Sequence, residues 1–327
     1  MAGTDTDGTR GFSCRLLTAT AARPGAIAIL QLDGDVEPAL RAITGIADWP
    51  HGRARLVRFA DVDRGLAVRL TERVAQPMPH GGPRVVQRLC AWMDRLGIET
   101  ASCDEVLPEL AFPEASDRFE AMALAAVARA ASPLAIDLLL DQPRRWRAMT
   151  APDEEDLARS KRLNRLIVAP IVVVTGPVNV GKSTLGNALV GRSMSIATDL
   201  PGSTRDYTSG RVELAGIVVD WHDTPGRRDT TDAIEAEAAR IADRLVDSAD
   251  LVIAMTDHET AWAALKRTPD LRVANKCDLA ARRDADLSIS ATDGTGIPEL
   301  VRAVRDLLVP PEDLKHPGVW VFDDRLT

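Results

Sequence analysis

The alternation of apolar runs and polar stretches predicts two α/β regions connected by helices. In the N-terminal part, the apolar run 26–30 follows the turn pair Pro24-Gly25 and predicts a buried strand. Helical spacing is present at 36–43 and at 85–93. In the C-terminal part, the β-branched run 171–174 precedes a glycine-containing loop and a helical pattern. The chain is therefore expected to belong to the α/β class.

Helical patterns also separate the two regions. Residues 119–140 are rich in Ala and Leu with helical period, and Pro143 is expected to end that helix. A second, highly charged helix is expected at 153–165. These patterns predict a flexible N-terminus at 1–12, a small α/β domain at 13–118, a helical connector at 119–167, a second α/β domain at 168–309 and an irregular tail at 310–327.

The loop that follows 171–174 has the spacing of a phosphate-binding loop. Residues 176–183 read Gly-Pro-Val-Asn-Val-Gly-Lys-Ser, a complete G-x-x-x-x-G-K-[ST] pattern between a strand and a helix. The N-terminus of that helix favours an anion, Lys182 can reach the β- and γ-phosphates, and the Ser183 hydroxyl can bind Mg²⁺. The nucleotide contacts expected here are Gly176, Asn179, Val180, Gly181, Lys182, Ser183 and Thr184.

Two further segments predict the metal and γ-phosphate contacts. Thr204, in the polar loop 199–206, can add a second hydroxyl to Mg²⁺. The second segment is Asp223-Thr224-Pro225-Gly226, in which Asp223 would hold the metal through water. Gly226 has no side chain, so its backbone NH can approach the γ-phosphate closely.

Two more segments predict a guanine site. The carboxylate of Asp278, in Asn275-Lys276-Cys277-Asp278, can accept from N1 and N2 of guanine, whereas adenine offers no matching donor pair. A backbone NH of Ser290-Ala291 can donate to guanine O6. Each motif alone also fits an ordinary surface loop, but their common order predicts GTP binding, and Asn275-Lys276-Cys277-Asp278 disfavours an ATPase or nucleotide kinase.

Composition limits the remaining possibilities. The chain has 327 residues and a net charge of −8, which argues against a general nucleic-acid coat protein. Its cysteines, and the histidines His51, His222, His258 and His316, lack metal-ligand spacing, so these residues predict no metal site in addition to Mg²⁺. No apolar run approaches the roughly 18 residues of a membrane helix, and a soluble, cytoplasmic protein without membrane association is expected.

The basic cluster Arg144-Arg145-Trp146-Arg147 has two interpretations. It fits an RNA contact in which Trp146 stacks on a base, or a solvated helical face, which is the preferred interpretation.

Several of these segments resemble the MnmE (TrmE) tRNA-modification GTPases of the Era-like class. The resemblance lies in 176–189, in 198–206, where the sequence is Thr-Asp-Leu-Pro-Gly-Ser-Thr-Arg-Asp, and in 223–226. Residues 19–29 and His80-Gly81-Gly82-Pro83 resemble the tetrahydrofolate-binding dimerisation domain of that family. The resemblance therefore implies a P-loop GTPase domain at 168–309 after a TrmE-N-like domain at 13–118. It also implies a homodimer, a folate derivative beside His80, and tRNA or a flavin-dependent protein as partner.

The resemblance also implies catalytic roles. Members of the family hydrolyse GTP when their G domains dimerise around K⁺. The positions that bind this ion in the family correspond to Asn179 and Thr198 here. Arg227 stands where Ras-like proteins have a water-positioning glutamine, and the matching family glutamate is Glu235. The expected catalytic set is Glu235, Thr204 and Lys182, although a solvated glutamate in an Ala/Glu-rich helix also explains Glu235.

Departures from the family pattern leave two functions open. No cysteine follows Cys277, so the Cys-x-Gly-Lys motif is absent, and Gln31 replaces an arginine. Little sequence is left for the family's helical domain, which suggests a shortened member. The leading hypothesis is a K⁺-stimulated GTPase that hydrolyses GTP to GDP and phosphate and is linked to tRNA wobble-uridine modification. The alternative is a nucleotide-switch GTPase that acts on a protein or ribosomal partner.

Overall fold

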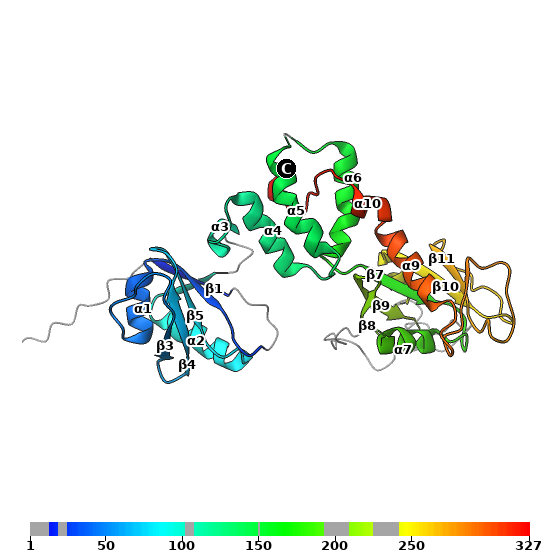
Figure 1. The fold of residues 1–327 in the computed structure, drawn as a ribbon. Helices are drawn as coiled ribbons and strands as arrows, with labels where there is room; N and C mark the ends of the chain where they lie inside the picture. Colours follow the sequence, from blue (N-terminus) through cyan, green and yellow to red (C-terminus); the bar gives the residue numbers. More distant parts are fainter. Residues whose placement is uncertain (1–12, 19–24, 102–107, 150, 193–208, 225–241) are drawn as a thin grey trace, which may run out of the picture. The chain divides into compact units, whose positions relative to one another are not determined.

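The computed structural model describes residues 13–18, 25–101, 108–149, 151–192, 209–224 and 242–327 (Figure 1). The chain divides into two compact units, Met1–Ala128 and Arg129–Thr327, each with its own sheet. Among the described residues, no helix combines the length and the apolar character needed to cross a bilayer.

The first unit contains a six-stranded sheet in the order β3-β4-β5-β2-β1-β6. Neighbouring strands are antiparallel except for β1 and β6. The strands are β1 (Cys14–Thr18), β2 (Leu30–Gly34), β3 (Arg55–Phe59), β4 (Asp63–Arg69), β5 (Val74–Met78) and β6 (Glu99–Ala101). The helices are α1 (Val36–Thr44), α2 (Pro83–Arg95), α3 (Pro108–Ala111) and α4 (Arg118–Arg129), the last of which crosses the unit boundary.

One face of this sheet forms the core with α1 and α2. Leu30, Leu32 and Phe59 are fully buried in the same cluster as Leu40 of α1 and Met93 of α2. Successive side chains of a strand point to opposite faces, so the intervening residues face away from these helices. This second face carries the hollow described below.

The helices expected in this unit are confirmed, whereas the expected strand is displaced. The helix expected at 36–43 is α1, and the one expected at 85–93 is α2, which begins at Pro83. The strand expected at 26–30 instead begins at Leu30, and the preceding run contributes only the isolated bridge between Ile27 and His80. Gln31 and Asp33 alternate with buried leucines in the observed strand, so the alternating segment, not the continuous apolar run, forms the ladder.

The helices from α4 onward differ from the expected pattern. The Ala/Leu-rich stretch forms α4 and α5 (Ala135–Arg147), separated at 130–134, and Pro143 lies inside α5. The prediction that Pro143 ends a helix is therefore wrong. Its neighbour Gln142 is held from outside because the Trp320 backbone NH donates to Gln142 Oε1 at 2.7 Å. The expected charged helix is α6 (Glu154–Leu163), with a capping box between Asp153 and Asp156, followed by η2 (Asn164–Leu166).

The tail packs against these helices. It contains α10 (Pro311–Lys315) and η3 (Asp324–Leu326), and Trp320 is fully buried. Trp146 Nε1 donates to the Trp320 carbonyl at 3.1 Å, and Arg162 pairs with Asp313 at 2.6 Å. The expected irregular tail thus contains two short helical segments, whereas residues 316–323 have no helix or strand. The buried Trp146 is also unavailable for stacking on RNA.

The rest of the second unit is a doubly wound α/β domain, as predicted. Its sheet has the order β12-β11-β10-β7-β9-β8, with all neighbours parallel except β8 and β9. The elements are β7 (Ile171–Thr175), α7 (Lys182–Arg192), β8 (Ser209–Leu214), β9 (Ile217–Asp223), β10 (Leu251–Thr256), β11 (Leu271–Ala274), β12 (Leu287–Ser288) and α9 (Ile297–Leu308). The chain moves from β7 to β9 on one side and to β10 on the other, so β7 is the topological switch point, where such sheets bind ligands.

Candidate functional site

The predicted phosphate and base segments meet at the carboxyl ends of the parallel strands. The phosphate loop follows β7, Asp223 ends β9, and Asn275 follows β11. Val174 is paired with Asp223 in the ladder, and the Thr224 hydroxyl donates to the Val174 carbonyl at 3.0 Å. The sheet thus fixes Asp223 and Thr224 beside the start of the phosphate loop.

Close backbone approaches require the glycines of this loop. A Cβ atom on Gly176 would lie 2.0 Å from the Met255 carbonyl oxygen, and one on Gly181 would lie 2.3 Å from Asn275 Nδ2. Gly181 also has a φ of 94°, and Asn179 is left-handed with a φ of 64°. The motif therefore selects residues that let the loop pass against β10 and the base-recognition segment.

Lys182 is buried beneath the phosphate loop. Its Nζ donates to the carbonyl oxygens of Gly176 at 3.1 Å and Pro177 at 2.8 Å. Burial lowers the pKa of Lys182, while the negative charge of Asp223 acts in the opposite direction. The ammonium is thus held inside the loop by neutral acceptors, which phosphate oxygens can replace with a stronger, charge-assisted contact.

Ser183 and Asp223 form the candidate Mg²⁺ site. The Ser183 hydroxyl donates to Asp223 Oδ2 at 2.5 Å. The other oxygen, Oδ1, is buried without a hydrogen-bond partner among the described residues. Burial raises the pKa of Asp223, although the Ser183 hydrogen bond opposes the shift. A hydroxyl and a carboxylate with an unpartnered oxygen are a donor set that fits Mg²⁺.

Asn275 connects the phosphate loop to the base-recognition loop. Its Nδ2 donates to the Val180 carbonyl at 2.8 Å, and its Oδ1 accepts from the Ala291 backbone NH at 2.9 Å. The Ser290 NH donates to the Thr295 carbonyl at 2.9 Å. Both NH groups of Ser290-Ala291 therefore have protein acceptors in this structure, and the donation of one of them to guanine O6 stays a prediction. The amide of Asn275 joins both halves of the site.

The base-recognition loop contacts a buried carboxylate that no sequence motif contains. Lys276 has a φ of 60°, and its Nζ donates to Asp257 Oδ2 at 2.7 Å. Asp278 is exposed, so its carboxylate is open to a base. Asp257 follows β10, far from the Asn275–Asp278 motif in the sequence. It comes close to Lys276 only because β10 and β11 are adjacent in the sheet, so the motif could not reveal it.

The remaining predicted site residues lie outside the described residues. They are Thr198, Thr204, Pro225, Gly226 and Glu235. Their assigned roles stay predictions. Thr184 is exposed at the start of α7, next to Ser183, where the amide groups of the helix N-terminus are available to an anion.

Comparison with known proteins identifies the family. Residues 171–292 match the family described as 50S ribosome-binding GTPase. The solved FeoB G-domain from Methanococcus jannaschii is 26% identical and covers 43% of this chain and 98% of that chain, with a TM-score of 0.34. The tRNA modification GTPase MnmE of Methylorubrum populi is 41% identical over 153 residues, which are 46% of this chain and 34% of that protein.

A longer match decides the assignment. The tRNA modification GTPase MnmE of Acidiphilium cryptum is 34% identical over 340 residues, covering 86% of this chain and 78% of that protein. The chain belongs to the MnmE family. It is a GTPase whose G domain carries the phosphate, metal and base segments described above.

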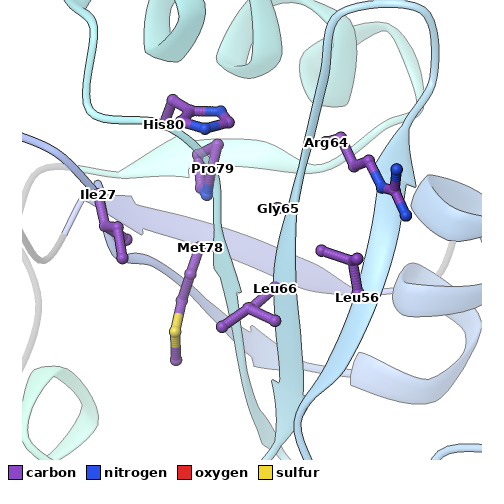
Figure 2. A pocket seen from close by; sticks show the side chains of 8 residues that line it. All are labelled: Ile27, Leu56, Arg64, Gly65, Leu66, Met78, Pro79 and His80. Atoms are coloured by element: carbon purple, nitrogen blue, oxygen red, sulfur yellow. The ribbon is translucent and has the colours of Figure 1, made fainter.

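The N-terminal unit of this MnmE-family chain has a hollow on the sheet face opposite α1 and α2. Leu56 is the ladder partner of Leu66, and Leu66 that of Met78, so the three form a row across β3, β4 and β5. Figure 2 shows this row, with Arg64 and His80 along the same hollow, which encloses about 410 Å³. Ile27 and Leu56 are both more than half exposed.

His80 is oriented at this hollow by a carboxylate. Its backbone NH donates to Asp63 Oδ2 at 2.8 Å, and its Nδ1 lies 2.9 Å from Asp63 Oδ1. Burial alone would raise the pKa of Asp63, but the hydrogen bonds from His80 outweigh it and lower that pKa. His80 therefore has a fixed direction while its ring stays exposed.

Proposed function

We propose that this chain binds GTP with Mg²⁺ at the carboxyl ends of β7, β9 and β11, and hydrolyses it in support of tRNA wobble-uridine modification in the cytoplasm. The observation that carries the GTP site is the double contact of Asn275, which binds the Val180 carbonyl and the Ala291 NH. This contact sets the distance between the phosphate end and the base end of one nucleotide.

The described side chains have distinct roles in the proposed reaction. Lys182 would exchange its contacts with the loop carbonyls for the β- and γ-phosphates. Ser183 and Asp223 would hold Mg²⁺, and Thr204, which lies outside the described residues, is predicted to supply the second hydroxyl. The metal, when bound, supplies positive charge to the phosphate oxygens. Asp278 would accept the two donors of the guanine edge.

Hydrolysis also needs an oriented water molecule and a positive charge at the γ-phosphate. We assign the first role to Glu235 and the second to K⁺, bound through Asn179 and Thr198 between two G domains. The left-handed φ of Asn179, 64°, and its exposure support this assignment because they place the residue at the outer surface of the loop. Dimerisation of G domains around the ion follows from the proposal.

The test is GTP hydrolysis in K⁺ against Na⁺ at equal ionic strength, over a range of protein concentrations. The expected result is stimulation by K⁺ that rises with concentration. Glu235→Ala is expected to lower kcat about 100-fold, in the range typical of general acid–base and water-positioning residues, with GDP affinity retained. The matched control is Glu237→Ala, two residues further along. An equal rate of hydrolysis in K⁺ and in Na⁺ would refute the K⁺ assignment. An unchanged kcat in Glu235→Ala would refute the role of Glu235.

The hollow of the N-terminal unit supports a second role, in folate binding and homodimer formation. Its apolar row can accept a flat pterin ring, and the Arg64 guanidinium can pair with the carboxylates of the glutamate tail. Binding of a reduced folate measured by calorimetry tests this role. Arg64→Ala should weaken binding, whereas Arg95→Ala, at the end of α2, should not.

The alternative is a nucleotide switch that acts on a ribosomal or protein partner. The match of residues 171–292 to a family described as ribosome-binding favours it. Sedimentation of the GTP-loaded protein with tRNA, with a flavin-dependent partner, or with 50S subunits separates the two functions. Nucleotide-dependent binding to tRNA supports the tRNA role, and binding only to the 50S subunit supports the switch.

A further inference from the structure

The connection between β10 and β11 differs from the usual crossover of parallel strands. Such connections normally contain a helix, but the described residues 257–270 contain none. The first of them, Asp257, is buried, with Oδ1 accepting from the backbone NH groups of Glu259 at 3.2 Å and Thr260 at 2.9 Å. Its other oxygen remains for one further partner.

That partner is Lys276, in the base-recognition loop. Its Nζ lies 2.7 Å from Asp257 Oδ2, and the Asp257 side chain is 6% exposed. Burial alone would raise the pKa of Asp257, but hydrogen bonds from Lys276 and Thr260 outweigh it and hold that pKa well below its usual range. The ion pair holds Lys276 in the left-handed backbone conformation. For a residue other than glycine this conformation costs about 1 kcal/mol or more and needs support from its surroundings.

Arg282 holds the Asp257 segment from the other side. Its Nη1 donates to the carbonyls of Asp257 at 2.8 Å and Thr260 at 2.5 Å, and its Nε donates to Asp284 at 2.6 Å. The guanidinium carbon also lies 4.9 Å from the ring centroid of Trp262, whose Nε1 donates to Asp284 at 2.9 Å. The loop after Asp278 is thereby tied to the loop after β10.

We propose that Asp257, fixed in place by Arg282, is a positioning residue for guanine recognition. The inference rests on the proposed GTP site and concerns its base end. Asp257 sets the conformation of Lys276, and this conformation directs Asp278 toward the base two residues later. Pre-positioned groups bind a ligand more tightly because less ordering is needed at the moment of binding. The phosphate end does not contact this network, since Asn275 alone joins the two ends among the contacts described above.

The test compares a ligand that has a base with one that has none. Asp257→Asn keeps the shape of the side chain and removes its charge. GDP affinity is expected to fall about tenfold, while the affinity for Mg²⁺ and inorganic tripolyphosphate stays within about twofold of wild type. Glu299→Gln is the matched control, since it breaks an exposed ion pair with Arg302 on α9. Calorimetry with the full chain measures both ligands.

A second variant keeps the proposal testable if Asp257→Asn does not fold. Arg282→Gln leaves Asp257 charged but weakens the contacts that fix it, so GDP affinity should fall about threefold with tripolyphosphate again unaffected. Arg282→Lys should restore part of the loss. Equal losses for both ligands, or no loss of GDP affinity, would overturn the proposal. Failure of the wild-type chain to bind GDP would instead overturn the proposed function.

Discussion

The two six-stranded sheets of this chain present their candidate sites in different ways. In the second unit the strands are parallel except for β8, so the GTP site is built from the loops at their carboxyl ends. In the first unit the strands are antiparallel except for the β1–β6 pair, and the hollow is built from side chains on one face of the sheet.

This difference decides how each site is encoded. A site built from loops uses consecutive residues, and the phosphate loop is a continuous eight-residue pattern that can be found in the sequence. A site on the face of a sheet uses alternate residues of separate strands, such as Leu56, Leu66 and Met78. No contiguous motif describes that row. If the comparison is right, changes in one site should leave the other unaffected.

The largest effect is expected from Lys182→Ala. This change removes the buried ammonium that reaches the phosphates, and GTP hydrolysis should fall at least about 100-fold, the typical cost of removing one electrostatic contact to the transition state. Steady-state kinetics and GDP calorimetry measure it. Folate binding should be unchanged. Lys161→Ala, an exposed lysine of α6, is the control. Residual hydrolysis above a tenth of wild type would contradict the assigned role.

A somewhat smaller effect is expected from Gly181→Ala. The new Cβ would lie 2.3 Å from Asn275 Nδ2, and φ is 94°, so the Asn275 contact to Val180 must break or the loop must shift. GDP affinity should fall about tenfold, because the change removes a hydrogen bond between uncharged groups and strains the backbone locally.

Gly210→Ala, in β8, provides the matched control for this change, because its Cβ would meet nothing within 4 Å. Calorimetric titration of both variants with GDP makes the comparison. Equal affinities in the two variants would show that the contact between the phosphate loop and Asn275 does not support nucleotide binding.

Leu56→Asp is expected to act on the first unit alone. A charge at the most exposed end of the apolar row should weaken a homodimer formed by this face by at least about tenfold. GDP affinity per protomer should not change. Leu307→Asp, at a comparably exposed leucine of α9, is the control. Sedimentation equilibrium measures the dimer, and a change in GDP affinity would show that the two sites are coupled.

The sequence predicted those parts of the fold that depend on neighbouring residues. Helix α6 was found from its charge pattern, and the strand, loop and helix around residues 171–189 were found from their continuous order. Strand β1 was missed, and β2 was displaced, because pairing with a distant strand decides which segment joins a ladder. Pro143 was read as a helix end, but contacts from the distant Trp320 hold its neighbour Gln142 in α5.

The candidate site was predictable to the same extent. The motifs located Lys182, Ser183, Asp223 and Asn275, and the structure brings these residues together. Asp257 was missed because it approaches Lys276 only through the pairing of adjacent strands. The donation from Ser290-Ala291 to guanine stays a prediction, and the protein acceptors that these NH groups have in the structure could not be read from a motif.

The smallest expected effect is in the tail, where Asp323 accepts from Arg325 at 2.6 Å and lies 3.7 Å from Arg129. The Arg325 hydrogen bonds lower the pKa of Asp323, against the effect of burial. A carboxyl group whose folded pKa is lowered stabilises the fold above its unfolded pKa, and this contribution is lost as pH falls through the folded pKa. Asp323→Asn should therefore lower the Tm of the second unit at pH 7 by about 2 to 4 °C, and by less at an acid pH below the ordinary pKa of aspartate.

Scanning calorimetry of the full chain at both pH values makes the measurement, with Asp324→Asn at the neighbouring exposed carboxyl as control. Because Asp323 and its arginine partners all belong to the second unit, the unfolding of the first unit should not respond. An equal shift at both pH values would mean that the charge of Asp323 is not what stabilises the fold, since a protonated carboxyl and an amide have nearly the same shape. A shift in the Tm of both units would show that they unfold in one cooperative transition. This result would contradict the expectation that changes in one site leave the other unaffected.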